Sequence, residues 1–347
     1  MAQGTQMKSR FFLLLLAALL LAPEAASAQA KVRVIYHPIR DNKLPLWVAQ
    51  DRGFFKKYGL DVTLTAEPQQ RGENAVKAVL AKQIEIAVAG FRDVVKPLAE
   101  HGKPDLVMLA SLAWNPFVFI AHPDIKTPAD LKGKKMWTAG LGHGPDVSTR
   151  LVLRHMGLDP EKDVELMPCE GCPAKLFGEP VSGHSIGVSW IFEGKGVASL
   201  SSRSTLKDLD KAGMKYTLLV DFIDAGIPIT AADVIVHKDW LAANRETAKN
   251  FLRAIAEATR YAKSNKEAAE EILKKNVLKD YATGMDTKFE DYVMGVLPTK
   301  PYPEAKGAEL AIAEKAPGHP FYKDRKASDF IDASLLSEIE KEGLLGK

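Results

Sequence analysis

The sequence of 347 residues is poor in cysteine, in charge of one sign and in long apolar runs. Its two cysteines cannot form a disulfide framework, so the fold must depend on ordinary hydrophobic burial. Lys and Arg number 47 against 44 Asp and Glu, and a net charge of +3 is too small to indicate a nucleic-acid-binding surface. With 46% hydrophobic and 26% charged residues, the composition is typical of a folded globular protein, and the length suggests two domains.

Motifs for common catalytic and nucleotide-binding sites are also missing. The sequence holds no His-Glu-x-x-His, no Walker loop and no Rossmann glycine spacing, and its eight histidines are scattered. We therefore expect no catalytic residue, no metal site and no cofactor.

The N-terminal residues predict export. Lys8 and Arg10 precede the uncharged apolar run 11–22, and small residues lead up to Ala28. A run of about 12 residues is too short for a membrane anchor, which needs about 20, so the order is typical of a cleaved signal peptide over residues 1–28. We expect cleavage after Ala28, with Ala30 as the alternative, and a mature protein that is periplasmic or outside the cell.

Strands and helices alternate along the mature chain. The hydrophobic pattern predicts strands at 31–36, 61–65 and 84–89 and helices at 46–58 and 74–82. This order is typical of a parallel α/β sheet, in which ligands lie beyond the carboxyl ends of the strands.

Two places along the chain suggest a change of direction. One is Trp114-Asn115-Pro116, because proline interrupts strand pairing between the predicted strands 106–112 and 117–121. The other is the stretch from Gly226 to Thr230. The remaining predicted elements are strands 136–139, 186–190, 216–221 and 233–237 and helices 145–155, 206–212 and 245–263.

Four segments carry a resemblance to a known family: 44–62 (LPLWVAQDRGFFKKYGLDV), 81–90 (AKQIEIAVAG), 127–135 (TPADLKGKK) and 157–164 (GLDPEKDV). Together they resemble solute-binding proteins of the nitrate, sulfonate and taurine ABC-import family. Pyrimidine-precursor binders and a fungal thiamine-pyrimidine synthase belong to the same superfamily. The resemblance covers about residues 31–275.

The resemblance implies a type II periplasmic binding fold, with two α/β lobes joined by two crossings. One lobe would hold residues 31–114 and 227–347, and the other residues 115–226. The family usually has an acidic residue where this chain has Ser182-Gly183-His184-Ser185, and this difference leaves the ligand open. The implied protein is a monomer that works with an ABC permease and captures a small molecule by closure of the lobes.

Residues at the predicted strand ends are candidates for ligand binding. His37 and Asn42 follow the first strand, where a solvated turn is the alternative reading. Gly90 would let backbone approach a ligand, Phe91 would stack on a planar group, and Arg92 would hold a carboxylate or sulfonate through two hydrogen bonds. The alternative for Arg92 is a surface pair with Asp93.

The second lobe supplies further candidates. Gly142, His143 and Gly144 precede a helix that begins with proline, so unpaired N–H groups there would favour an anion, unless the segment is only a turn. Ser189 and Trp190 end the predicted strand 186–190, from which Trp190 would cover the ligand or pack in a core. The two crossings add Asn115 and Thr230 as ligand-binding candidates.

The two cysteines form the motif Cys169-Glu170-Gly171-Cys172 between Pro168 and Pro173. Zinc would need two more ligands at suitable spacing, and thioredoxin-like chemistry would need a helix start. In an oxidising compartment, we expect a local disulfide between Cys169 and Cys172.

These observations predict a solute-binding protein for a small, planar or anionic organic molecule. Two rival functions are an enzyme resembling the thiamine-pyrimidine synthase and a sensor subunit that presents its ligand to a receptor. The export signal and the close spacing of the only two cysteines count against the synthase. The sequence does not separate a sensor from a transporter subunit.

Overall fold

The computed structural model describes residues 29–345, apart from 38, 40, 70, 115–116, 139, 141–143, 170–171, 182–184, 231 and 277–295. The predicted signal peptide, residues 1–28, lies outside this range, as do the candidates Asn115, Gly142 and His143. Within the described part of the chain, no helix is both long enough and apolar enough to cross a membrane.

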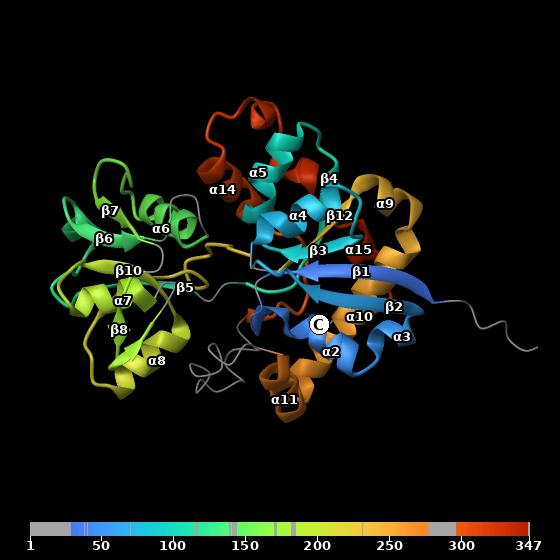
Figure 1. Cartoon of the computed structure of the whole chain (residues 1–347), viewed down its shortest axis with the longest axis horizontal. Coiled ribbons are helices and arrows are strands. Elements are labelled where there is room, and N and C mark those ends of the chain that lie inside the picture. Colours follow the sequence, from blue (N-terminus) through green and yellow to red (C-terminus); the bar gives the residue numbers. More distant parts are fainter. Residues whose placement is uncertain are drawn as a thin grey trace, which may run out of the picture.

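A five-stranded sheet forms the centre of the larger part of the molecule (Figure 1). The strand order is β2-β1-β3-β12-β4. β1 is parallel to β2 and β3, whereas β12 is antiparallel to both of its neighbours. The parallel arrangement predicted from the alternation is confirmed for β1, β2 and β3, and β12 makes the whole sheet mixed. Its strands are β1 (Ala30–Tyr36), β2 (Leu60–Ala66), β3 (Ile86–Ala89), β4 (Leu106–Ser111) and β12 (Asp233–His237).

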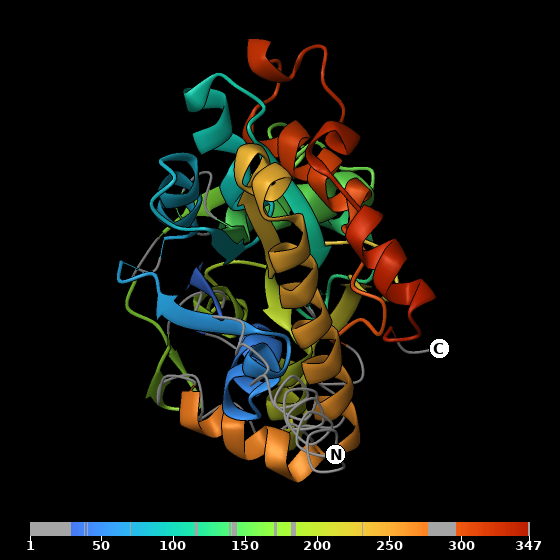
Figure 2. The same cartoon turned by 90° about the vertical axis from the view of Figure 1, so that its right-hand side faces the viewer.

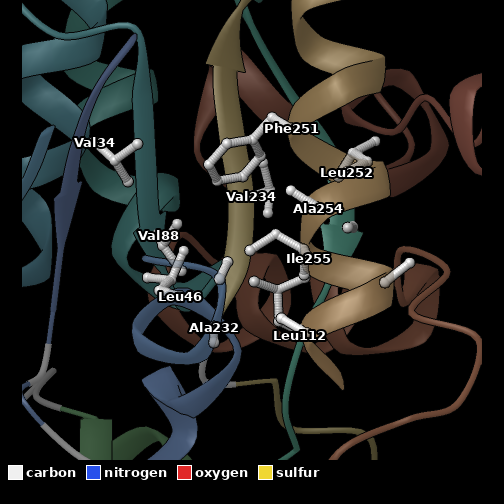
Figure 3. Close-up of a cluster of buried hydrophobic side chains, with 14 of the residues drawn as sticks. Val34, Leu46, Val88, Leu112, Ala232, Val234, Phe251, Leu252, Ala254 and Ile255 are labelled. Carbon is white, nitrogen blue, oxygen red and sulfur yellow. The ribbon is translucent and has the colours of Figure 1, made fainter. Parts of the chain in front are cut away.

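Helices cover both faces of this sheet, because alternate strand residues point to opposite sides. On one face, Val34, Val88 and Val234 pack against Leu46 and Phe251 from the helices (Figure 3). The helices on this face are α2 (Leu44–Asp51), α3 (Phe54–Lys57), α10 (Arg245–Ser264), α11 (Lys266–Asn276) and α15 (Ser334–Lys341). α10 is the long gold helix at the centre of Figure 2.

The opposite face of the sheet is covered by α4 (Gly72–Leu80), α5 (Arg92–His101) and α14 (Ala305–Lys315). Two short 3-10 segments, Pro320–Tyr322 and Ala327–Phe330, complete this layer. We call the five-stranded sheet with these helices lobe 1. α9 (Lys238–Ala243) follows β12 directly.

A single helix predicted over 46–58 is instead two helices. Gly53 has a φ of 72°, a left-handed conformation that favours glycine and ends α2 before α3 begins. The chain turns here, so that Phe55 of α3 can stack on Phe251 of α10, with ring centroids 5.3 Å apart.

A smaller group of elements, which we call lobe 2, lies beside lobe 1 (Figure 1). Its main sheet has the order β10-β5-β11, with β5 antiparallel to both neighbours. The strands are β5 (Phe117–Ala121), β6 (Lys135–Thr138), β7 (Glu165–Pro168), β8 (Lys175–Leu176), β9 (Glu179–Pro180), β10 (Ala198–Ser202) and β11 (Thr217–Asp221). The helices are α6 (Gly144–His155), α7 (Ser185–Phe192) and α8 (Arg203–Lys211).

The strand predicted at 186–190 is wrong, since these residues lie within α7. Most of this helix is buried, and periodicity does not separate a short, largely apolar helix from a buried strand.

The chain passes between the lobes twice, after β4 and before β12. The two crossings lie side by side, because Trp114 and Thr230 form an isolated antiparallel bridge. Next to this bridge, the Leu112 N–H donates to the Ala232 carbonyl at 2.7 Å. This architecture confirms the predicted fold of two α/β lobes joined by two crossings.

Candidate ligand-binding site

Charged groups gather where the strands of lobe 1 end toward the crossings. His37 follows β1, and Lys43 ends a short 3-10 turn before α2. Arg92 and Asp93 begin α5, directly after β3. Asp233 joins them although it begins its strand, because β12 runs opposite to β3 and its amino end meets the carboxyl end of β3. A small volume thus holds side chains of both signs.

Asp233 is fully buried and accepts three hydrogen bonds. Its Oδ1 accepts from the Ser111 hydroxyl at 2.7 Å. Its Oδ2 accepts from the Phe91 N–H at 2.7 Å and from the Thr230 hydroxyl at 2.6 Å. Burial raises the pKa of Asp233 to about 6, although the three hydrogen bonds favour the charged form. Thr230, a predicted ligand contact, thus directs its hydroxyl proton to this carboxylate.

Lys43 is also fully buried, and its Nζ donates to the side-chain oxygen of Asn42 at 2.9 Å. Burial lowers the pKa of Lys43 to about 7, and the neighbouring Asp93 and Asp233 oppose this shift. Asn42 itself is only 5% exposed. The predicted pocket residue Asn42 therefore contacts the internal ammonium group of Lys43.

His37 lies among these charges as a neutral ring. Burial is the main cause that lowers its pKa to about 4, and Lys43 and Arg92 lower it further, whereas Asp93 and Glu67 oppose the shift. Its Nδ1 is buried and has no hydrogen-bond partner among the described residues. A neutral imidazole at this position can accept or donate one hydrogen bond to a ligand.

Arg92 faces a crevice between the two lobes. The crevice is narrow, with a volume of about 20 Å³, and its lining includes Ser148 of α6, Thr230 of the second crossing and Ala311 of α14. The Nη1 atom of Arg92 is buried and has no hydrogen-bond partner among the described residues. An unpaired guanidinium donor can hold an anionic group from a ligand.

Gly90 allows this placement of Arg92, for a reason different from the predicted one. A Cβ at Gly90 would lie 3.1 Å from the Thr230 carbonyl oxygen and 3.6 Å from Cγ of Arg92. The missing side chain therefore lets the second crossing and the arginine pack over the strand end. The predicted direct approach of the Gly90 backbone to a ligand stays a prediction.

Phe91 lies deeper than the sequence suggested. Its side chain is 3% exposed and packs against Phe330, with ring centroids 6.3 Å apart. It also borders the inner wall of the crevice. The apolar layer under α5 buries most of this ring, and its stacking on a planar ligand stays a prediction.

Lobe 2 meets the crevice through the first turns of α6. Gly144 begins this helix, and the adjoining candidates Gly142 and His143 lie outside the described residues. The buried Asp146 contacts the Thr138 hydroxyl at 3.1 Å and the Arg150 Nε at 3.0 Å. A buried carboxylate in the first turn thus precedes Ser148, which borders the crevice.

Ser189 and Trp190 belong to the interior of lobe 2. Ser189 Oγ lies 2.8 Å from the Lys175 carbonyl oxygen and 2.6 Å from Glu193 Oε1. Trp190 packs in a small cluster with Trp137 and Ile186. Neither side chain lines the crevice that Arg92 faces. Their predicted place at a strand end is wrong, because α7 directs them into the lobe.

Gly183, Ser185 and Gly187 have the Gly-x-Ser-x-Gly spacing of a hydrolase elbow, a match that the expectation of no catalytic residue overlooked. Gly187 has a packing reason, since a Cβ there would overlap the side chain of Ser199 and crowd Trp137. Gly183 lies outside the described residues. The close approach of α7 to β10 therefore explains one of the two glycines.

Cys169 and Cys172 are paired as a disulfide, with Cα atoms 5.8 Å apart. The Trp137 indole N–H donates to the Cys169 carbonyl at 3.0 Å, which fixes the loop to β6. Across the described parts of the chain, no three His, Cys, Asp or Glu side chains group so as to hold a metal ion.

Four charged residues near the site were not predicted as site residues: Lys43, Glu67, Asp93 and Asp233. Asp233 had a detectable signal, because it precedes the apolar strand Val-Ile-Val and follows two alanines. Asp93 lies over Gly72, where a Cβ would overlap its carboxylate. That contact joins residues that are distant in the sequence, so no local sequence pattern predicts it.

Comparisons with known proteins agree with this fold. YtlA of Bacillus subtilis (strain 168) is 24% identical over 245 residues, which cover 70% of this chain and 68% of YtlA. The periplasmic aliphatic sulphonate binding protein SsuA from Escherichia coli has a similar structure, with a TM-score of 0.60, 15% identity and coverage of 92% of this chain and 94% of SsuA.

The periplasmic nitrate-binding protein NrtA from Synechocystis PCC 6803 is also similar, with a TM-score of 0.62, 17% identity and coverage of 92% of this chain and 91% of NrtA. The model of one family, described as NMT1/THI5 like, matches residues 41–269. These findings confirm the predicted family resemblance, and the chain belongs to the NMT1/THI5-like family.

Proposed function

We propose that this protein is the extracytoplasmic solute-binding component of an ABC importer and that it captures a small organic anion between its lobes. The observation that carries the proposal is the Nη1 of Arg92, which is buried at the crevice between the lobes and has no hydrogen-bond partner in the described part of the chain. A guanidinium in this setting favours a carboxylate or sulfonate, because charge-assisted hydrogen bonds strengthen when water is excluded.

In this proposal, each lobe contributes one half of the ligand-binding site. Residues 31–114 with 227–347 form one lobe, and residues 115–226 form the other. Arg92, His37 and Thr230 lie on the side of lobe 1, and α6, which begins at Gly144, lines the crevice from lobe 2 with Val147, Ser148 and Leu151. Rotation about the paired crossings at Trp114 and Thr230 would bring both half-sites onto one ligand.

Capture in this proposal is binding and closure without catalysis. The open form leaves each half-site in water, and the closed form buries the ligand and its polar contacts. Export after cleavage at Ala28, a monomeric state and delivery to a membrane permease belong to the same proposal. The periplasmic binding proteins SsuA and NrtA share the fold and support it.

Native mass spectrometry of protein purified without denaturation identifies a bound ligand, and calorimetry then measures its affinity for variants. Arg92→Ala should weaken binding of an anion about tenfold to a hundredfold, the loss of a charged hydrogen bond of about 1.5–3 kcal/mol. Arg33→Ala is the matched control, since Arg33 is more than half exposed and pairs with Glu85 on the same sheet. Unchanged binding by Arg92→Ala contradicts the proposal.

An enzyme is the second function to test, because the superfamily that the resemblance implies also includes a fungal thiamine-pyrimidine synthase. The same mass spectrometry separates the two functions. A binding protein releases its ligand with unchanged mass, whereas an enzyme converts an added substrate. A ligand that returns with a changed mass would contradict simple capture.

A further inference from the structure

We propose that Asp233 is a positioning residue, which holds the turn that carries Arg92 against both crossings between the lobes. The inference rests on the proposed function, because it assigns Arg92 to the ligand. It goes beyond that function because it makes a fully buried carboxylate, which lies behind the crevice lining and is bonded to Phe91 and Thr230 of that lining, responsible for where the guanidinium lies.

The three donors to Asp233 come from three separate segments. The Phe91 N–H belongs to the turn between β3 and α5, one residue before Arg92. Ser111 is the last residue of β4, where the first crossing begins. Thr230 lies in the second crossing and is bridged to Trp114 in the first. A single side chain therefore connects the arginine turn to both connections between the lobes.

A carboxylate suits this position because all three partners donate. Ser111 is also held by the Glu304 N–H, which donates to its Oγ at 3.2 Å, so its hydroxyl proton is directed to Asp233. An amide would place N–H groups toward one of these donors, and that donor would have to turn away. The nearby ammonium of Lys43 supplies a compensating positive charge.

Burying the Asp233 carboxylate costs desolvation free energy, which an apolar side chain of similar size would not. If Asp233 only stabilised the fold, removing its carboxylate would raise hydrogen exchange throughout lobe 1. If Asp233 positions the arginine turn, the change is confined to Phe91, Arg92 and Thr230. This difference in location separates the two interpretations.

The experiment measures amide hydrogen exchange by NMR and the rate at which phenylglyoxal modifies Arg92, followed by peptide mass spectrometry. Asp233→Asn should raise both the Phe91 exchange rate and the Arg92 modification rate about tenfold, the effect of losing one hydrogen bond. Amides in the middle of β1 and β6 should keep their protection. Ser111→Ala and Thr230→Val should act in the same direction.

Asp221→Asn is the matched control. Asp221 lies in lobe 2, pairs with Arg203 and accepts from the N–H groups of Ile223 and Asp224. It should leave Phe91 and Arg92 unchanged. If Asp233→Asn raises exchange equally throughout lobe 1, or leaves Phe91 unchanged, the positioning role is overturned. If that variant fails to fold, Ser111→Ala and Thr230→Val decide by the same criterion.

A second experiment tests whether Asp233 acts through Arg92. It measures binding of ethanesulfonate, as the anionic probe, by calorimetry. Asp233→Asn should lose about tenfold in affinity in the presence of Arg92 and nothing further in the Arg92→Ala background. Equal losses in both backgrounds overturn the inference. If the unmodified protein does not bind ethanesulfonate, this sulfonate is excluded as a ligand of the proposed anion site, and the exchange and modification rates still decide the role of Asp233.

Discussion

Arg154 of α6 and Glu314 of α14 form an ion pair between the two lobes, with 3.2 Å between Arg154 Nε and Glu314 Oε1. α14 packs against α5 in lobe 1 and against α6 in lobe 2 (Figure 1). Its Leu310 also contacts the hydrophobic cluster of lobe 2 that contains Leu151 and Phe222. The C-terminal part of the chain thus adds a third connection beside the two crossings.

Removal of either partner of this pair should have unequal effects on stability. The Glu314 side chain is 6% exposed, and burial raises its pKa, whereas the Arg154 side chain is 48% exposed. Arg154→Gln leaves a buried carboxylate without its partner and should lower the free energy of unfolding by about 1–2 kcal/mol at pH 7. Glu314→Gln should cost less than about 1 kcal/mol. Urea unfolding measures both values.

The difference should shrink in acid, because Glu314 becomes neutral below its raised pKa and then no longer needs Arg154. Lys162→Gln is the control, since Lys162 forms an exposed pair with Asp159 and should change stability little. A larger loss for Glu314→Gln than for Arg154→Gln would contradict this account of the pair.

Gly307→Ala should loosen α14 from the second crossing. A Cβ at Gly307 would overlap the carbonyl oxygen of Pro228, and a backbone atom cannot rotate away as a flexible side chain does. We expect a loss of about 1–3 kcal/mol in the free energy of unfolding, as for overpacking elsewhere. Gly196→Ala is the control, because its Cβ would make only ordinary contacts from 3.4 Å outward. Equal stability of the two variants would show that α14 is not held there.

The ring of His37 should titrate with a midpoint near 4 when its signals are followed by NMR. The folded pKa lies below the ordinary value of 6.5, so the unfolded chain binds the proton more readily. The contribution of His37 to stability is therefore complete above about pH 6.5 and is lost as the pH falls toward 4.

His37→Gln should flatten the decline of the melting temperature over this pH window. The pKa of Asp233 is raised to about 6, so that group acts with the opposite slope, and the ring signal is the direct measurement. A His37 midpoint near 6.5 would show that the ring is solvated and charged in mild acid.

The Cys169–Cys172 pair should leave almost no free thiol in protein purified from an oxidising compartment. Denatured, unreduced protein titrated with a thiol reagent tests this expectation. The closed loop is very short, so the double substitution of both cysteines by serine should lower stability by about 2 kcal/mol or less. Two reactive thiols per chain would contradict the pairing.

Local patterns predicted most of the strands and helices. β5 and β12 have the predicted bounds, 117–121 and 233–237, because each is a short apolar run between turn residues. The helix predicted at 145–155 is α6, which begins one residue earlier at Gly144. The ends of such elements are predictable because proline, glycine or the end of the apolar pattern marks them in the sequence.

Features that depend on distant parts of the chain were not predictable. α7 was mistaken for a strand because its apolar residues are buried by β10 and β6, which no local period records. Lys43 and Asp233 are buried only because their elements meet across the sheet. Arg92 was identified as a ligand candidate from its place after β3, but the crevice beside it depends on α6, α14 and the second crossing.

The place of β12 in the sheet of lobe 1 governs the order in which the protein can assemble. β12 lies between β3 and β4, although all of lobe 2 separates it from them in the sequence. A growing chain therefore leaves the inner edges of β3 and β4 without a strand until residue 237 has emerged. Pairings across such a long separation form slowly. The first half of the chain is thus kept from completing its sheet until lobe 2 and β12 have been synthesised.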